Sequence, residues 1–408
     1  MDLSQSFLVR NAKWLSAGAL LTFLSSFGQT FFISIFAGEI RETFSLSHGA
    51  WGSIYSLGTT ASAIAMIWAG SLTDVFRVRV LGPVILIGLT LACLSMAFVS
   101  AVWFLPLVIF ALRFTGQGMT SHIAVVAMAR WFVATRGKAL SIATLGFSVG
   151  EAILPLTFVA LMVIFDWRIL WLVAAGIALL GAPILAMLLR QERTPREISA
   201  ENPSAGMNGL HWTRNGALRH PLFWFMVPAL LGPSAFNTAF FFHQVHFAEI
   251  KGRQHIELVA YFPLYTGFSV VAMMLSGWAL DKWGTARLMP LYQLPLVFSF
   301  LAFSWASEPT LAWIGFVFLA MTTGFNSTLP NAFWAEFFGT NHIGSIKAMA
   351  AAIMVLGSAI GPGVTGILID FGIGLETQFI AIAVYFLLTT AMMWIGIARF
   401  RDSVPSYR

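Results

Sequence analysis

The chain has 408 residues, of which 58% are hydrophobic and only 10% are charged. An average soluble domain carries roughly 25% charged residues, so a soluble protein with this composition would lack a charged exterior. The composition therefore excludes a soluble globular protein and predicts an integral membrane protein. The net charge of +6 does not indicate a nucleic-acid partner, because the basic residues are spread over short loops.

Twelve apolar stretches are long enough to cross a membrane as helices, which takes roughly 20 residues each. They lie at 14–36, 51–70, 80–100, 104–129, 139–163, 168–189, 222–246, 257–279, 288–306, 309–334, 347–370 and 376–398. Of the 23 Lys and Arg residues, eighteen fall in the termini and the even-numbered loops, and four fall in the odd-numbered loops. Because cytoplasmic loops carry the excess of basic residues, we expect both termini in the cytoplasm and insertion in a bacterial-type inner membrane.

A polar stretch at 190–221 divides the chain into halves. We therefore expect an N-terminal six-helix bundle at 1–189, a cytoplasmic linker at 190–221 and a C-terminal six-helix bundle at 222–408. The halves share residues at one fixed offset of 207 positions. The matching residues are Gly70 and Gly277, Asp74 and Asp281, Gly137 and Gly344, Gly150 and Gly357, and Pro155 and Pro362. Two six-span copies make parallel repeats, related by an axis along the membrane normal.

The loop after the eighth span reads Gly277-x-x-x-Asp281-Lys282-x-Gly284-x-x-Arg287. It resembles the cytoplasmic loop signature of the major facilitator superfamily. The copy after the second span keeps Gly70, Asp74 and Arg79, but Val75 and Arg77 stand where a base and a glycine are usual. The resemblance covers the span count, the linker and the repeat. It implies an all-α membrane protein with twelve transmembrane helices in two pseudo-symmetric bundles, the major facilitator fold.

In this family the loop holds the cytoplasmic side shut. The residues implied in gating are Gly70, Asp74, Arg79, Arg130, Gly277, Asp281, Lys282 and Arg287. We expect the two glycines to permit close helix approach, and Arg130 to be a partner of Asp74. The alternative is that these are loop charges that fix only the topology.

The family fold places spans one, four, seven and ten around a central cavity. Strongly polar side chains are costly in hydrocarbon and should face that cavity, and these spans hold many of them. The expected substrate-binding residues are Gln29, Arg113, Gln117, Asn237, His243, Asn326 and Asn331. For the histidine and the asparagines, hydrogen bonding to neighbouring helices is the alternative.

Two charged residues lie deep in adjacent spans. Arg113 is roughly 14 Å from the periplasmic end of span four, and Glu151 is roughly 20 Å from the cytoplasmic end of span five. In a core of about 30 Å these depths are similar, which allows a structural ion pair. The other hypothesis is that Arg113 binds an anionic substrate and Glu151 carries a coupling proton. Arg113-Phe-Thr-Gly116-Gln-Gly118 resembles the family's fourth-helix pattern, in which the arginine is associated with proton coupling.

Several further features bound the chemistry. His243 and His246 lack a third ligand nearby in the sequence, so we expect no metal site, and no cofactor is expected. A phosphate-binding Gly-rich loop with Lys-Ser/Thr is absent, so ATP is not the energy source within this chain. Gly146 with Gly150, and Gly357 with Gly361, are typical of helix-packing faces in spans five and eleven.

We expect a secondary transporter, a monomer in the lipid bilayer and not an enzyme, that moves a small molecule by alternating access. A small organic anion of carboxylate type, carried by proton symport, is favoured because Arg113 is the only base in the cavity region. The stretches at 130–139 and 166–168 resemble the monocarboxylate and oxalate-formate branch, but span eight lacks the base usual there. The alternatives are proton-driven export of amphipathic drug-like compounds, transport of a polar neutral solute, and a non-transporting sensor on a transporter fold.

Overall fold

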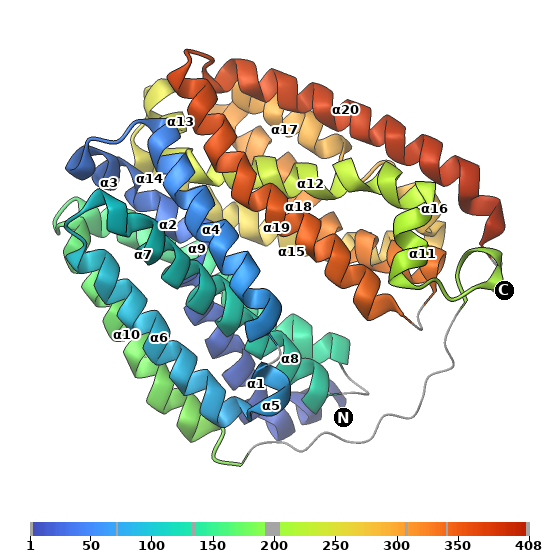
Figure 1. The fold of residues 1–408 in the computed structure, drawn as a ribbon, viewed down its shortest axis with the longest axis horizontal. Helices are drawn as coiled ribbons and strands as arrows, with labels where there is room; N and C mark the ends of the chain where they lie inside the picture. The colour runs from blue at the N-terminus through green and yellow to red at the C-terminus, as the bar shows by residue number, and fades with distance from the viewer. Residues whose placement is uncertain are drawn as a thin grey trace. The chain divides into compact units, whose positions relative to one another are not determined.

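The computed structural model describes residues 3–70, 72–132, 136–191, 205–306, 309–339 and 342–404. Every regular element in these ranges is a helix (Figure 1). Nine of the described helices are long and apolar enough to cross a membrane. A tenth span is the pair Phe7–Gly28 and Thr30–Phe44, which is bent by 47°. The prediction of an all-α membrane protein is confirmed.

The two other predicted spans are also helical in the structure. One is α4 (His48–Ala69), which is as long as the others but rich in Gly, Ser and Thr. The other is α17 (Leu294–Ser304), with only 11 residues. Pro295 stands at the start of α17, where a proline is tolerated because no helical donor is needed. The residues before it form turns instead of a further helical turn.

The chain folds into two compact units. The first comprises Met1–Ser199 with Phe241–Ala248 and Gln254–Phe262, and the second comprises Ala200–Phe240, Glu249–Arg253 and Pro263–Arg408. The first unit therefore includes two short segments that come from beyond the polar linker. Each unit is described separately below.

The first unit is built mainly on long helices that pack in pairs: α1 with α9, α6 with α10, and α4 with α7. Figure 1 shows α6 and α10 side by side. Besides α4, its helices are α1 (Leu3–Leu24), α2 (Thr30–Ile33), α3 (Ala37–Phe44), α5 (Leu72–Val75), α6 (Val78–Phe98), α7 (Leu105–Leu112), α8 (Ser121–Trp131), α9 (Arg136–Met162), α10 (Trp167–Leu188) and α14 (His255–Val259).

In the second unit α17 packs between α18 and α20. Besides α17, its helices are α11 (Arg214–Arg219), α12 (Pro221–Phe242), α15 (Phe262–Trp283), α16 (Thr285–Leu288), α18 (Pro309–Phe338), α19 (Ile343–Asp370) and α20 (Leu375–Phe400). The last residues of α12 and the first of α15 belong to the first unit, and α13 (Gln244–Ile250) begins there.

Glycines pack the equivalent helices of both units closely. A Cβ added to Gly146 in α9 would lie 1.9 Å from the Ala19 carbonyl oxygen in α1. A Cβ added to Gly361 in α19 would lie 2.1 Å from the Ala235 carbonyl oxygen in α12. Both distances are far below van der Waals contact, so only glycine fits. The predicted packing faces are confirmed, and the same pair of helices meets in each half.

The loop signature has a different backbone in its two copies. Gly284 has φ +72° and ψ 167°, a region that is essentially reserved for glycine. The equivalent residue of the first half is Arg77, whose φ of −68° suits any residue. Arg77 in place of this glycine therefore causes no backbone strain in the first copy, because the backbone has a different conformation there.

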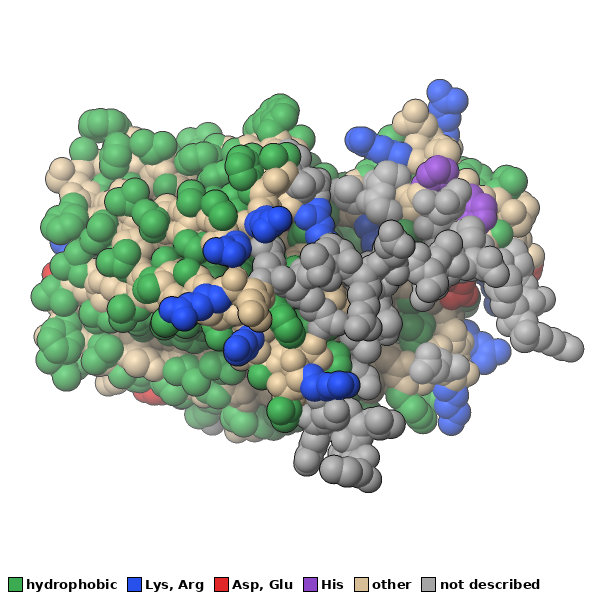
Figure 2. Space-filling model, turned by 90° about the horizontal axis from the view of Figure 1, so that it is seen from below, with side chains coloured by type: hydrophobic (Ala, Val, Ile, Leu, Met, Phe, Trp, Pro, Cys, Tyr) green, Lys and Arg blue, Asp and Glu red, His purple; other side chains and the backbone are tan. Residues whose placement is uncertain are grey.

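Large apolar side chains cover much of the outside. Trp103, Val163 and Phe98 are 79%, 83% and 71% exposed. Figure 2 shows one face of the molecule, where Lys and Arg side chains stand out from a surface of hydrophobic ones. Exposed apolar surface on this scale requires an apolar solvent, which the bilayer supplies.

The end of the polar linker is fixed by a histidine in an aromatic cluster. The His220 ring lies 4.8 Å from that of Trp212 and 4.6 Å from that of Phe400, between ring centroids. Its Nδ1 accepts a hydrogen bond of 3.3 Å from the Leu222 N–H, so that nitrogen is unprotonated. Burial lowers the pKa of His220 below its ordinary value of 6.5.

This histidine predicts a pH-dependent stability. Because its pKa in the folded state is below 6.5, its contribution is complete above pH 6.5 and is lost as the pH falls toward the folded value. We expect the melting temperature of the detergent-solubilised protein to fall by a few degrees between pH 7.5 and pH 5. His220→Phe keeps the ring contacts and removes the titration, so its curve should be flatter. Parallel pH curves for the two proteins would contradict this assignment.

Candidate functional site

In the first unit a broken helix crosses an unusual helix. The first span ends its α-helix at Leu24, continues as a 3₁₀ turn over Ser25–Gly28, and is extended at Gln29 (φ −86°, ψ 153°). The fourth span contains a π-helix over Arg113–Thr120. Interrupted spans and π-helices are frequent at functional sites. Their crossing is therefore the candidate site of this unit.

Two glycines bring these backbones into contact. A Cβ added to Gly28 would lie 2.2 Å from the Leu112 carbonyl oxygen, and one added to Gly116 would lie 2.6 Å from the Gly28 Cα. No side chain fits at either position. Three predicted substrate-binding residues lie at this contact: Gln29, Arg113 and Gln117. Arg113 donates a hydrogen bond to the Gly28 carbonyl oxygen, and a Cβ added to Gly28 would lie 2.7 Å from the Gln117 backbone nitrogen.

Arg113 is buried among neutral groups. Its side chain is 2% exposed. Nη1 donates to the Gly28 carbonyl oxygen at 3.2 Å and to the Thr30 hydroxyl at 3.3 Å. The guanidinium carbon lies 5.4 Å from the centre of the Tyr55 ring, and the hydroxyls of Thr30 and Tyr55 are 2.5 Å apart. Nε is buried and donates to no atom of the described residues.

The predicted pair of Arg113 and Glu151 is not formed. All the hydrogen bonds and ring contacts of Arg113 within the described residues are with Gly28, Thr30 and Tyr55. Glu151 is partly buried on α9, one residue after Gly150, where an added Cβ would lie 2.2 Å from the Ser26 hydroxyl oxygen. Equal depth in the membrane does not bring two side chains together when they lie on different faces of their helices.

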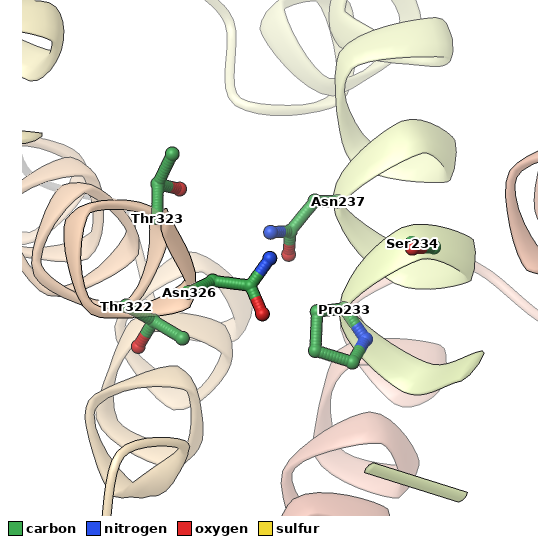
Figure 3. Close-up of a pocket in the computed structure, with 6 residues that line it drawn as sticks. All are labelled: Pro233, Ser234, Asn237, Thr322, Thr323 and Asn326. Carbon is green, nitrogen blue, oxygen red and sulfur yellow. The ribbon is translucent and has the colours of Figure 1, made fainter. Parts of the chain in front are cut away.

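In the second unit a small polar cavity of about 90 Å³ lies between α12 and α18. Its lining residues are Pro233, Ser234, Asn237, Thr322, Thr323 and Asn326. In Figure 3 the carboxamides of Asn237 and Asn326 point toward one another from the two helices. The side-chain amide oxygen of Asn237 and the Thr322 hydroxyl are buried without a hydrogen-bond partner in the described structure. The lining of the cavity is uncharged and consists largely of side chains that can donate or accept hydrogen bonds.

The third predicted asparagine lies outside this cavity. The Asn331 side chain is exposed, and its amide donates to the Ser327 carbonyl oxygen of its own helix at 3.0 Å. Local bonding of this kind satisfies the amide without a ligand.

His243 lies in the first unit and is 3% exposed. Its ring centroid is 5.9 Å from that of His48, which is 4.1 Å from that of His246. The proximity of His48 could not be predicted from the sequence, because His48 precedes the other two histidines by almost two hundred residues. The described residues contain no cluster of three or more His, Cys, Asp or Glu side chains that could hold a metal ion.

The structure describes the side chains of some of the predicted gate residues. The Arg130 guanidinium donates to the Thr73 carbonyl oxygen, next to Asp74. Arg79 donates to the Arg190 carbonyl oxygen at 3.4 Å. The side chains of Asp74 and Asp281 lie outside the described part of the structure.

The second copy of the gate loop departs from the expectation of close helix approach. A Cβ added to Gly70 would lie 3.5 Å from the His122 ring, but one added to Gly277 would meet no atom of the described residues within 4 Å. Lys282 covers the rings of Trp278 and Trp283 at 5.2 and 5.6 Å, and Arg287 is exposed. The close approach predicted for Gly277 is therefore wrong in this structure.

Comparisons with known proteins agree with this architecture. A sequence model described as the Major Facilitator Superfamily matches residues 18–362. No curated protein matches the chain. The fold is similar to that of a bacterial homolog of the human lysosomal transporter Spinster, inward-facing and occupied, with a TM-score of 0.76, 16% identity and coverage of 100% of both chains. The nucleoside transporter NupG has a TM-score of 0.69 at 13% identity, with 94% of this chain and 98% of that chain covered. At these identities the structural likeness shows the fold alone.

Proposed function

Because the chain belongs to the Major Facilitator Superfamily, we propose that it is a secondary active transporter that moves a small organic anion of carboxylate type by alternating access. Membership of this family makes it a membrane transporter and not an enzyme. The substrate class and the energy source are the parts of this proposal that need support from the sites.

The observation that carries the anion proposal is the environment of Arg113. A buried cation with only neutral partners is costly in a membrane, and intramembrane charges of this kind mark substrate or ion pathways. A guanidinium binds a carboxylate through two parallel N–H bonds. Here Nη1 is occupied by protein acceptors, whereas Nε donates to no acceptor in the part of the chain that the structure describes. An anion that reaches Nε would supply the missing charge and the missing acceptor.

The cavity at Asn237 and Asn326 offers the solute neutral hydrogen bonds. Its lining favours polar groups that donate or accept hydrogen bonds, such as amides, hydroxyls or ring nitrogens. The same cavity favours a second candidate function, transport of a neutral polar solute, and one structural neighbour is named a nucleoside transporter. The stretches at 130–139 and 166–168, which resemble the monocarboxylate and oxalate-formate branch, agree with the anion proposal.

We propose Glu151 as the site of the coupling proton, since it is the acidic residue deep in span five. Glu151→Gln cannot release or take up a proton, so we expect it to abolish accumulation of solute driven by an imposed pH gradient. Exchange of labelled for unlabelled solute across the membrane needs no net proton movement and should persist. Both rates can be measured in the same proteoliposomes. Undiminished pH-driven accumulation by the variant would exclude Glu151 as the coupling site.

The substrate class can be identified with the purified protein. Any compound that binds the folded state raises its melting temperature. We would test lactate, oxalate, benzoate, uridine, glucose and the amphipathic cation tetraphenylphosphonium at two pH values. The anion proposal predicts that carboxylates give the largest shifts in wild type and none in Arg113→Ala. Shifts only with uridine or glucose would favour the neutral solute, and shifts only with the lipophilic cation would favour the drug exporter.

A further inference from the structure

Helix α12, which provides Ser234 and Asn237 to the polar cavity, contains two prolines, Pro228 and Pro233. Proline has no N–H, so Pro233 cannot donate to the carbonyl oxygen of Ala229 four residues earlier. Inside a membrane no water is available to replace that bond, and an unsatisfied carbonyl is strongly unfavourable. Another donor must therefore reach Ala229 for the helix to keep a proline there.

Two side chains from the turn before α17 supply that donor. The Gln293 amide nitrogen is 2.5 Å from the Ala229 carbonyl oxygen, and the Tyr292 hydroxyl donates to the same oxygen at 3.2 Å. Both residues lie ahead of the first residue of α17, in the stretch that Pro290 and Pro295 keep from extending this helix. Their position outside a regular helix lets both side chains reach one carbonyl.

The network continues to a third span. The Thr389 hydroxyl on α20 donates to the Gln293 amide oxygen at 2.9 Å. The Gln293 amide nitrogen is also 2.7 Å from the Tyr292 hydroxyl. Gln293 is completely buried, and Thr389 is 2% exposed. Both hydrogen-bonding ends of the Gln293 carboxamide are thus used, which leaves it one orientation.

We propose that Tyr292, Gln293 and Thr389, here called the Gln293 network, are positioning residues for the polar cavity. The network holds the proline-interrupted segment of α12 in place, and this segment carries Ser234 and Asn237 into the cavity one residue and one turn after Pro233. The role as a substrate-positioning device rests on the proposed transport function.

A double-mutant cycle tests the proposal, because Pro233→Ala restores the backbone N–H that can donate to the Ala229 carbonyl oxygen. In wild type Gln293→Leu should lower the melting temperature by at least about 3 °C. In the Pro233→Ala background the same substitution should change it by much less, since the helix then satisfies its own carbonyl. Thr389→Val removes the hydroxyl that bonds the Gln293 amide oxygen and the Phe386 carbonyl oxygen of its own helix, and serves as the milder variant. An equal loss in both backgrounds would overturn the link between Gln293 and the proline.

A second readout separates positioning from general stability. With Cys93→Ala as background, a cysteine introduced by Ser234→Cys reports the cavity through its rate of reaction with N-ethylmaleimide. We expect Gln293→Leu to change this rate at least threefold, and Pro233→Ala to abolish the change. A cysteine introduced by Ser327→Cys, on the exposed face of α18, should react equally in all backgrounds. An unchanged rate at position 234 would show that the Gln293 network stabilises the structure but does not position the cavity residues of α12. Neither readout uses transport, so the outcome is independent of the proposed function.

Discussion

Arg113→Lys is expected to lower the initial rate of uptake of the compound found in the thermal-shift screen about 100-fold, with the protein still folded. Lysine keeps the positive charge but lacks the planar fork that binds a carboxylate through two bonds. It also cannot present a nitrogen in the place of Nε while it bonds Gly28 and Thr30. A 100-fold effect corresponds to about 2.7 kcal/mol of lost stabilisation. Uptake by proteoliposomes with matched protein content measures it.

The control for Arg113→Lys is a variant that alters the same contacts but keeps the guanidinium. Thr30→Val removes one acceptor of Nη1 and the link to the Tyr55 hydroxyl, but leaves the guanidinium and the Gly28 carbonyl. We expect a loss of tenfold or less. If Arg113→Lys transports a carboxylate at the wild-type rate, the arginine has only a structural role at the break of the first span.

Gly146→Ala is expected to destabilise the protein by at least about 3 kcal/mol, because the new Cβ would lie 1.9 Å from a backbone oxygen that cannot move aside. Gly361→Ala should act alike in the second unit, where the distance is 2.1 Å. Thermal unfolding in detergent, followed by tryptophan fluorescence, measures both.

Gly176 in α10 provides the matched control, because a Cβ added there would meet no atom within 4 Å. Ala is favoured over Gly in a helix by about 1 kcal/mol. Gly176→Ala should therefore leave the melting temperature unchanged or raise it. Equal effects of Gly146→Ala and Gly176→Ala would show that helix propensity, and not close packing, decides the stability at these positions.

The general architecture was predictable because it depends on composition and on repetition. Apolar stretches must be helical in a bilayer, which satisfies no backbone groups. The offset of 207 residues relates Gly150 to Gly357, and each packs against the first predicted span of its own half, at Ser26 and Leu231. Glycine spacing in a helix is a strong signal, because few other reasons exist for two glycines on one face.

The local details of the sites were not predictable, because they depend on the face of the helix on which each side chain lies and on where the helices are interrupted. Rise per residue gives the depth of Arg113 and Glu151 but not the face on which each lies. No residue pattern in the sequence predicts the extended conformation at Gln29 or the π-helix that begins at Arg113. Both features change the direction of side chains in the two spans.

Gln293 illustrates the same limit in the second unit. Its polarity predicts that its side chain does not face lipid. Its hydrogen-bond partner, however, is the Ala229 carbonyl oxygen, which is 64 residues away in sequence. That carbonyl needs a donor only because Pro233 follows it by four residues. The relation can be derived once spans seven and nine are known to be neighbours, and the sequence does not contain that information.

A transporter moves solute across the membrane and does not only bind it. Uptake of labelled solute by proteoliposomes under an imposed pH gradient distinguishes the two, using the compound with the largest thermal shift. We expect accumulation above the external concentration in vesicles with wild-type protein, collapse of the gradient by a protonophore, no uptake by empty vesicles, and an initial rate about 100-fold lower with Arg113→Lys. A compound that binds wild type tightly and yet never enters the vesicles would contradict transport and leave a sensor on a transporter fold.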